Sequence, residues 1–175
     1  EGKKDEANQN FTFLFIVLMA VGTLVTIGVL VFIDPLLSFL GAIETLYTYS
    51  YDYLFTTVMF TLVTMAKLYF DFFLVTSGKA NLALINSVIG GVTNVILDYV
   101  FMGPLNMGMA GAAYATEIAM ILPVILSFIY FASKKLTICF TKPKAGIKLV
   151  LSACANGSSE MVVQISAGIS TFLFN

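Results

Sequence analysis

The sequence predicts an all-α integral membrane protein, a polytopic bundle of about five transmembrane helices. Of its 175 residues, 59% are hydrophobic and only 11% are charged, and the mean hydropathy is strongly positive. Soluble domains carry roughly 25% charged residues, and a soluble core of this size cannot enclose so much apolar surface. Five stretches also reach the ~20 mostly apolar residues that a helix needs to cross a bilayer.

The five predicted spans follow one another with mostly short connections. Their ranges are 11–33, 51–76, 82–103, 108–132 and 148–175. Pro35 cannot continue the first helix, and residues 34–44 have the pattern of a short amphipathic segment at the membrane interface. Short turns at 77–79 and 103–106 make the second, third and fourth spans antiparallel neighbours, whereas a longer hydrophilic connection, 133–147, precedes the fifth.

The placement of lysines predicts the orientation in the cell membrane. Eight of the nine lysines lie on one side of the predicted bundle, whereas the connections on the other side carry Asp34, Glu44 and Asp52 and no lysine. Cytoplasmic loops are enriched in lysine, so we expect the N-terminus to be cytoplasmic. The chain starts without methionine and stops inside an apolar run, so we also expect it to be a piece of a longer protein.

Several chemistries are excluded by residues that the sequence lacks. It has no histidine and only two cysteines, Cys139 and Cys154, which excludes His- or Cys-rich zinc sites and Ser-His-Asp or Cys-His catalysis. The net charge of −1 and the absence of arginine give no basic surface for nucleic acid. No phosphate-binding GxxxxGK[ST] pattern occurs. We therefore expect neither an enzyme nor a cofactor, and we expect both cysteines to be free.

Apart from Asp52 and Lys148 at the ends of their spans, five charged residues lie inside the predicted spans, where each costs at least ~2.5–3.5 kcal/mol. They are Lys67, Asp71, Asp98, Glu117 and Glu160. Lys67 and Asp71 are four residues apart and can form an ion pair on one helix face; we favour this interpretation over a role in binding substrate. Glu160 lies near the predicted midplane without a cationic partner, which indicates a titrating role or a partner outside this chain.

Asn94, Asp98 and Thr116 form a candidate cation site. Asn94 and Asp98 share a face of the third span, with Asp98 ~7.5 Å from its outer end, and Thr116 lies ~12 Å into the returning fourth span. The tight turn between the spans allows their carboxylate, amide and hydroxyl oxygens to meet. Such hard oxygen ligands suit sodium or a proton. The alternative is that Asp98 caps or hydrogen-bonds a neighbouring helix and stays neutral.

The residues around this site have further expected roles. Glu117 is about 100° around the helix from Thr116, so it faces either a cavity or a neighbouring helix. Gly90, Gly91 and the small residues of 108–113 are expected to let the third and fourth spans approach closely.

The third and fourth spans resemble the fifth- and sixth-helix signature of the multidrug and toxin extrusion (MATE) transporters. The resemblance lies in Asn94-Val-Ile-Leu-Asp98 followed by Gly108-Met-Ala-Gly-Ala-Ala-Tyr-Ala-Thr116. Other segments resemble, in matching order, the loop before the third helix, the stretch after it, the start of the fourth helix and the seventh helix: residues 2–7, 35–37 with 40–42, 53–54, and 156–160 with 173–175. The family pattern departs at Val75, where arginine is frequent, and at Ala80, where proline is frequent.

The resemblance implies a twelve-helix MATE-type fold of two six-helix lobes. Residues 1–132 would belong to the N-terminal lobe, 133–147 to a cytoplasmic inter-lobe loop, and 148–175 to the first helix of the C-terminal lobe. The family's N-terminal cation site matches Asn94, Asp98 and Thr116, and its second-lobe carboxylate matches Glu160. Glu117 is not a family feature and inherits no role.

The resemblance also implies the function, an antiporter that exports cationic or amphipathic organic compounds in exchange for sodium or protons. The partners would be these compounds, the lipid bilayer and the remainder of the same transporter chain. The alternative is a lipid or lipid-linked oligosaccharide flippase of the same superfamily, which would need more cationic residues to bind phosphates than the third and fourth spans carry. An enzyme, a receptor subunit or a channel is a weaker interpretation, because neither a catalytic pattern nor a filter-like repeat occurs.

Overall fold

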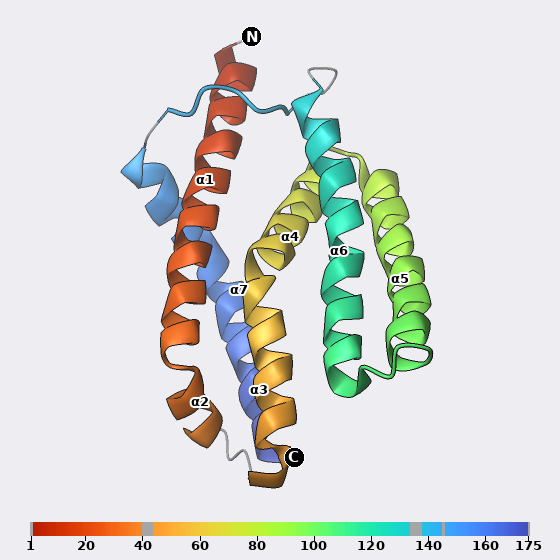
Figure 1. The fold of residues 1–175 in the computed structure, drawn as a ribbon. Coiled ribbons are helices and arrows are strands. Elements are labelled where there is room, and N and C mark those ends of the chain that lie inside the picture. The colour runs from red at the N-terminus through yellow and green to blue at the C-terminus, as the bar shows by residue number, and fades with distance from the viewer. Residues whose placement is uncertain (1, 40–43, 134–137, 145, 175) are drawn as a thin grey trace.

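The computed structural model describes residues 2–39, 44–133, 138–144 and 146–174, and all regular structure within these ranges is helical (Figure 1). The predicted all-α fold is thus confirmed. The helices are α1 Gly2–Val31, α2 Ile33–Phe39, α3 Glu44–Met59, α4 Thr61–Thr76, α5 Ala80–Met102, α6 Gly108–Ala132 and α7 Ile147–Phe174.

The first helix starts earlier than predicted. The apolar run begins at Phe11, whereas α1 already begins at Gly2 and includes the charged residues Asp5 and Glu6. The prediction was wrong here because an apolar run marks the part of a helix that lies in lipid, not the helix itself. With 30 residues, α1 is ~45 Å long, so it extends beyond a hydrocarbon core of ~30 Å.

A short helix, α2, replaces the first part of the predicted interfacial segment. Pro35 lies in its first turn, where a missing N–H breaks no intrahelical hydrogen bond. Ile33 and Leu37 are buried on one side of α2. The remainder of the predicted segment at 40–43 lies outside the described residues.

The second predicted span is two helices rather than one. α3 and α4 meet at Phe60, and their axes are bent by 50°. The Thr61 hydroxyl donates to the Thr57 carbonyl and the Thr64 hydroxyl to the Phe60 carbonyl, each at 3.4 Å. Such contacts can bend a helix, but a shorter one from Thr93 to the Ile89 carbonyl, at 2.8 Å, lies within the unbroken helix α5, so these contacts alone do not account for the bend. Neither glycine nor proline marks this position, so the sequence pattern gave no warning.

α5 and α6 form the most extensively packed helix pair (Figure 1). A Cβ added to Gly90 would lie 3.1 Å from Pro123 Cγ, and one added to Gly111 would lie 3.2 Å from Phe101 Cβ. The predicted role of small residues is confirmed at these two glycines. It is wrong for Gly91, whose added Cβ would meet nothing within 4 Å.

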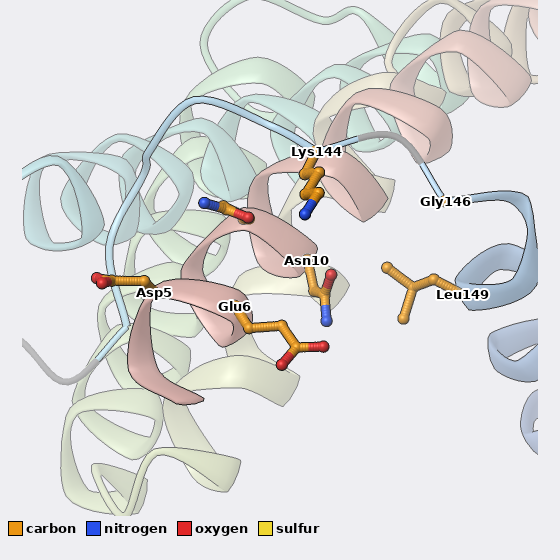
Figure 2. Close-up of a pocket in the computed structure, with 7 residues that line it drawn as sticks. Asp5, Glu6, Asn10, Lys144, Gly146 and Leu149 are labelled. Atoms are coloured by element: carbon orange, nitrogen blue, oxygen red, sulfur yellow. The ribbon is translucent and has the colours of Figure 1, made fainter. Parts of the chain in front are cut away.

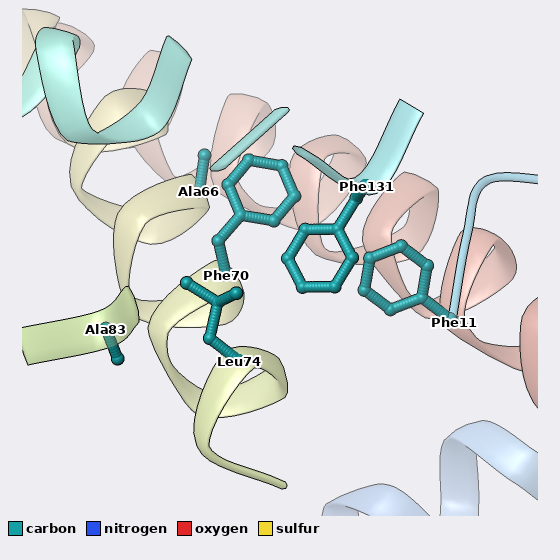
Figure 3. Packing of buried hydrophobic residues seen from close by; sticks show 6 residues of the cluster. All are labelled: Phe11, Ala66, Phe70, Leu74, Ala83 and Phe131. Atoms are coloured by element: carbon teal, nitrogen blue, oxygen red, sulfur yellow. The ribbon is translucent and has the colours of Figure 1, made fainter. Parts of the chain in front are cut away.

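A cluster of buried apolar side chains joins α1, α4, α5 and α6 near the end of the bundle that carries the N-terminus (Figure 3). The rings of Phe11 and Phe131 are 5.0 Å apart, and those of Phe70 and Phe131 are 5.5 Å apart. Most other large apolar side chains are exposed, as lipid-facing residues of a membrane bundle must be.

Four of the five predicted spans are supported by length and apolarity. α1, α5 and α6 each suffice to cross a membrane, and α3 with α4 qualifies as one bent pair. α7 has 28 residues, but Asn156, Glu160 and Gln164 interrupt its apolar sequence, and it is not among the described helices that are apolar enough. That α7 spans the membrane therefore stays a prediction. It also makes no extensive contact with the other described helices.

Candidate cation site between α5 and α6

Polar side chains cross the α5–α6 interface at two levels. The Asn86 side-chain N–H donates to Ser127 Oγ at 2.8 Å in a buried contact. Farther along both helices, Asn94 Nδ2 donates to Thr116 Oγ1 at 3.2 Å. The close approach at Gly90 lies between these two contacts, because glycine there lets the helix backbones come near enough for short polar side chains to meet.

The structure therefore brings together two of the three predicted site residues directly. Asn94 is half-buried, and Thr116 lies on an exposed side of α6. The Asn94 amide nitrogen faces Thr116, so a half-turn of the amide about its last bond would present the oxygen instead. Two neutral oxygens could then face the same point from the two helices.

Asp98 lies one turn beyond Asn94 on the same face of α5. Its Oδ1 is buried and has no hydrogen-bond partner in the part of the chain that the structure describes. A buried acceptor without a partner costs ~1–3 kcal/mol, and more when it is charged. This oxygen therefore calls for a cation, a proton, a water molecule or a group from elsewhere in the protein.

Among the described residues there is no group of three or more carboxylate, cysteine or histidine side chains that could hold a metal ion. A cation at Asp98 would have to use neutral oxygens as its further ligands, and Asn94 and Thr116 are of that kind. Sodium and protons accept such ligands, whereas soft metals do not.

Glu117 contacts a neighbouring helix, which was one of its two predicted environments. It is buried, with 5% of its surface exposed, and its Oε2 accepts a hydrogen bond of 3.2 Å from the Thr64 hydroxyl on α4. Adjacent residues of α6 thus face different partners, with Thr116 toward α5 and Glu117 toward the start of α4 beside the bend.

The remaining ionisable residues of the spans lie apart from this site. Lys67 Nζ and Asp71 Oδ2 form an ion pair of 2.7 Å, which confirms their predicted pairing. Glu160 is exposed on α7, where its Oε1 accepts a hydrogen bond of 3.0 Å from Gln164 Nε2. Both described cysteines are free, as predicted.

One contact was not predicted from the sequence. In the segment before α7, the Cys139 N–H donates to Asn8 Oδ1 and the Thr141 N–H donates to Thr12 Oγ1, each at 3.0 Å. Asn8 precedes the first predicted span, 11–33, and Thr12 lies at its start. The apolar pair Ile138 and Phe140 inside an otherwise hydrophilic connection was a signal that could have indicated this contact.

A hollow of about 500 Å³ lies near these contacts, between the N-terminal part of α1 and the start of α7 (Figure 2). Asp5, Glu6 and Asn10 line it from α1, Lys144 from the segment that precedes α7, and Leu149 from α7. It lies toward the opposite end of the bundle from the α5–α6 turn that follows Asp98 (Figure 1).

Comparisons with known proteins agree with this architecture. The MatE family model matches residues 1–100. The chain is similar to a multidrug resistance MATE family transporter of the MOP superfamily in its inward-facing conformation, with 23% identity and a TM-score of 0.89 over 97% of this chain. The chain is also similar to the outward-facing conformation of a multidrug resistance MATE family transporter of the MOP superfamily, with 22% identity and a TM-score of 0.90 over 97% of this chain.

A third similar structure is that of a MOP superfamily transporter from Pyrococcus furiosus. The reverse polarity of the binding pocket in that protein suggests that its function is different. It is 23% identical, with a TM-score of 0.88 over 97% of this chain. No curated protein sequence matches the chain significantly.

The chain spans about two fifths of the length of these structures, 39%, 38% and 38% in turn. The family match covers more than half of the chain, and the fold agrees along nearly all of it. The chain therefore belongs to the MatE family of membrane transporters and forms part of the MATE fold.

Proposed function

We propose that the chain is part of a cation-coupled antiporter that exports organic cations or drugs across the cytoplasmic membrane by alternating access. The observation that carries this proposal is the buried Asp98 Oδ1, which has no partner among the described residues. It lies one turn from the Asn94–Thr116 hydrogen bond. A sodium ion or a proton at Asp98 would satisfy this oxygen.

The proposed coupling follows from reciprocity. If binding of the cation at Asp98 favours the conformation that releases drug, binding of drug must favour release of the cation by the same factor. Glu160 is proposed as a second titrating carboxylate, on α7. Glu117 accepts a hydrogen bond from Thr64 inside the bundle. For this residue we propose a role in coupling through its contact with α4.

The proposed division into lobes places 1–132 in the N-terminal lobe, 133–147 in the inter-lobe loop and 148–175 at the start of the C-terminal lobe. The separation of α7 from the packed helices α1–α6 supports it. The lysine distribution supports a cytoplasmic N-terminus. Similar structures are of MATE in complex with MaD3S and with Br-NRF, which supports the proposal that the full protein binds drug-like compounds.

Asp98→Asn in the full-length protein tests the proposal. The substitution keeps the shape of the side chain and removes its charge, so we expect efflux of cationic dyes to fall at least tenfold while expression persists. Asp52→Asn is the matched control, because Asp52 is exposed on α3 and lies outside the site. Unchanged efflux in Asp98→Asn would refute the proposal.

A further inference from the structure

Residues 138–141, which we call the strap, lie across the N-terminal part of α1 before the chain enters α7. The strap is fixed to α1 by two hydrogen bonds from its backbone, Cys139 N–H to Asn8 Oδ1 and Thr141 N–H to Thr12 Oγ1, each 3.0 Å long. Asn8 and Thr12 are buried, with 7% and 8% of their surfaces exposed. The strap thus supplies backbone hydrogen-bond donors to two polar side chains that are buried away from water.

Phe140 anchors the strap to the apolar cluster. Its N–H donates to the Phe131 carbonyl at 3.3 Å. Its ring packs against four others, with centroid distances of 5.0, 5.5, 6.2 and 5.4 Å to Phe11, Phe15, Phe70 and Phe128. Figure 3 shows the chain passing beside Phe11, close to Phe131.

Release of the strap would disrupt several contacts at once. Asn8 Oδ1 and Thr12 Oγ1 would lose their backbone partners, and rings that now pack against Phe140 would be uncovered, Phe11 among them, which is only 1% exposed. Because a buried acceptor that loses its partner is costly and the ring contacts are lost in the same step, undocking is strongly disfavoured.

The chain changes character directly after Thr141. Lys142, Pro143 and Lys144 are exposed, and the hollow of about 500 Å³ separates α1 from the start of α7 (Figure 2). From Thr141 to Ile147 the chain can span at most roughly 20 Å. α7 is therefore tethered to α1–α6 through a short, exposed connection and has little packing against them.

The fold of the chain is similar to structures of two states of a transport cycle. The chain resembles the inward-facing and the outward-facing MATE structures with TM-scores of 0.89 and 0.90, each over 97% of its length. The overall fold of the chain is therefore similar to that of both conformations.

We propose that the strap stays docked on α1 throughout transport and that relative movement of α7 is taken up after Thr141. The strap then acts as a fixed anchor, and the short connection limits how far α7 can move from the first lobe. This inference rests on the proposed alternating access, in which the two lobes move against each other.

A disulfide between Asn8→Cys and Cys139 tests the anchor in the full-length protein. The Asn8 Oδ1 atom lies 3.0 Å from the Cys139 backbone nitrogen, so positions 8 and 139 are neighbours, and a short bis-maleimide serves as a second cross-linker that does not need disulfide geometry. All other cysteines, Cys154 among them, are replaced by serine. We expect oxidation to cross-link most of the protein and to leave at least half of the dye efflux measured in the reduced variant.

Two outcomes would overturn the anchor. One is a cross-link that abolishes efflux, with recovery on reduction, because the strap must then undock. The other is a failure of the folded variant to cross-link both on oxidation and with the short bis-maleimide, because positions 8 and 139 would then not be neighbours. Asn8→Cys with Cys139→Ser is the control for effects of the oxidant. If efflux is absent both in the reduced variant and in the same protein with Asn8 unchanged, the result counts against the proposed antiporter. The yield of the cross-link reports on the strap alone.

A second measurement keeps Asn8 intact. Cys139 is half-buried under the strap contacts, so its rate of labelling by a maleimide reports undocking. We expect this rate, divided by that of a small free thiol in the same buffer because maleimide reacts with the thiolate, to stay within twofold between high sodium, low pH and saturating dye. A change of tenfold or more in any of these conditions would contradict permanent docking.

Discussion

Asp71 and Asp98 both lie within the membrane bundle, but the surroundings of their carboxylates differ. Asp71 is neutralised by Lys67 at 2.7 Å on its own helix, whereas Asp98 has a buried oxygen without a partner in the described chain. Because pairing within one helix requires no partner from elsewhere, the first carboxylate is explained locally. The second is available to a ligand, and this difference is the basis of the proposed function.

Lys67→Met is expected to destabilise the protein by about 1–2 kcal/mol, because it leaves Asp71 partly buried and unpaired. The double variant with Asp71→Leu removes both charges and should recover most of the loss. Thermal unfolding of the purified full-length protein in detergent measures both. Equal stability of Lys67→Met and the unsubstituted protein would show that the pair has no stabilising role.

Thr116→Val removes one proposed neutral ligand while preserving side-chain volume. If sodium is the coupling ion, the sodium concentration for half-maximal efflux should rise about tenfold, as ~1.4 kcal/mol of lost binding free energy predicts. If protons drive export, efflux under an imposed pH gradient should change little. Thr93→Val is the control, because among the described residues the Thr93 hydroxyl bonds only the Ile89 carbonyl of its own helix.

At the scale of helices, the sequence predicted regular spans better than irregular ones. α6 coincides with its predicted range, 108–132, because turn residues bound a continuous apolar run. The bend at Phe60 was missed, since neither a glycine nor a proline marks it in the sequence. The polar start of α1 was missed because its stabilising contacts with the strap come from a distant part of the chain.

Gly90→Leu should destabilise the α5–α6 pair by about 1–3 kcal/mol, because a larger side chain cannot fit against Pro123 without displacing a helix. Gly91→Leu introduces the same side chain one residue away, where an added Cβ meets nothing within 4 Å. The melting temperatures of the two variants should therefore differ clearly. Similar values would mean that α5 and α6 do not approach closely at Gly90.

Thr64→Val should destabilise the junction of α4 and α6 by ~1–3 kcal/mol, because buried Glu117 loses its hydrogen-bond donor. Thr61→Val serves as the matched control, since within the part of the chain that the structure describes the Thr61 hydroxyl bonds only the nearby Thr57 carbonyl. Chemical unfolding in mixed micelles compares the two. A larger effect at Thr61 than at Thr64 would contradict the importance of the contact with Glu117.

At the scale of the whole molecule, the helical membrane fold and the family were predictable, whereas the site was predictable only in outline. Helical spacing placed Asn94 and Asp98 on one face, and the short turn brought Thr116 near them. The direction of Glu117 could not be derived, because it depends on how α4 packs against α6. Distance along the chain likewise concealed the contact between the strap and α1.

Orientation can be tested by labelling at opposite ends of the bundle. With the native cysteines replaced, Leu105→Cys in the α5–α6 turn should react with a membrane-impermeant maleimide in intact cells. Lys79→Cys in the α4–α5 turn should react only after lysis, as the lysine distribution predicts. The reverse pattern would mean that the N-terminus lies outside.

The bend at Phe60 has a consequence for how the protein enters the membrane during synthesis. α3 and α4 have 16 residues each, so either one alone reaches only ~24 Å, short of a ~30 Å hydrocarbon core. The translocation machinery must therefore accept both helices as one continuous segment. Because Glu117 on α6 accepts a hydrogen bond from Thr64 beside the bend, we expect the bent arrangement to be completed once α6 is also in the membrane.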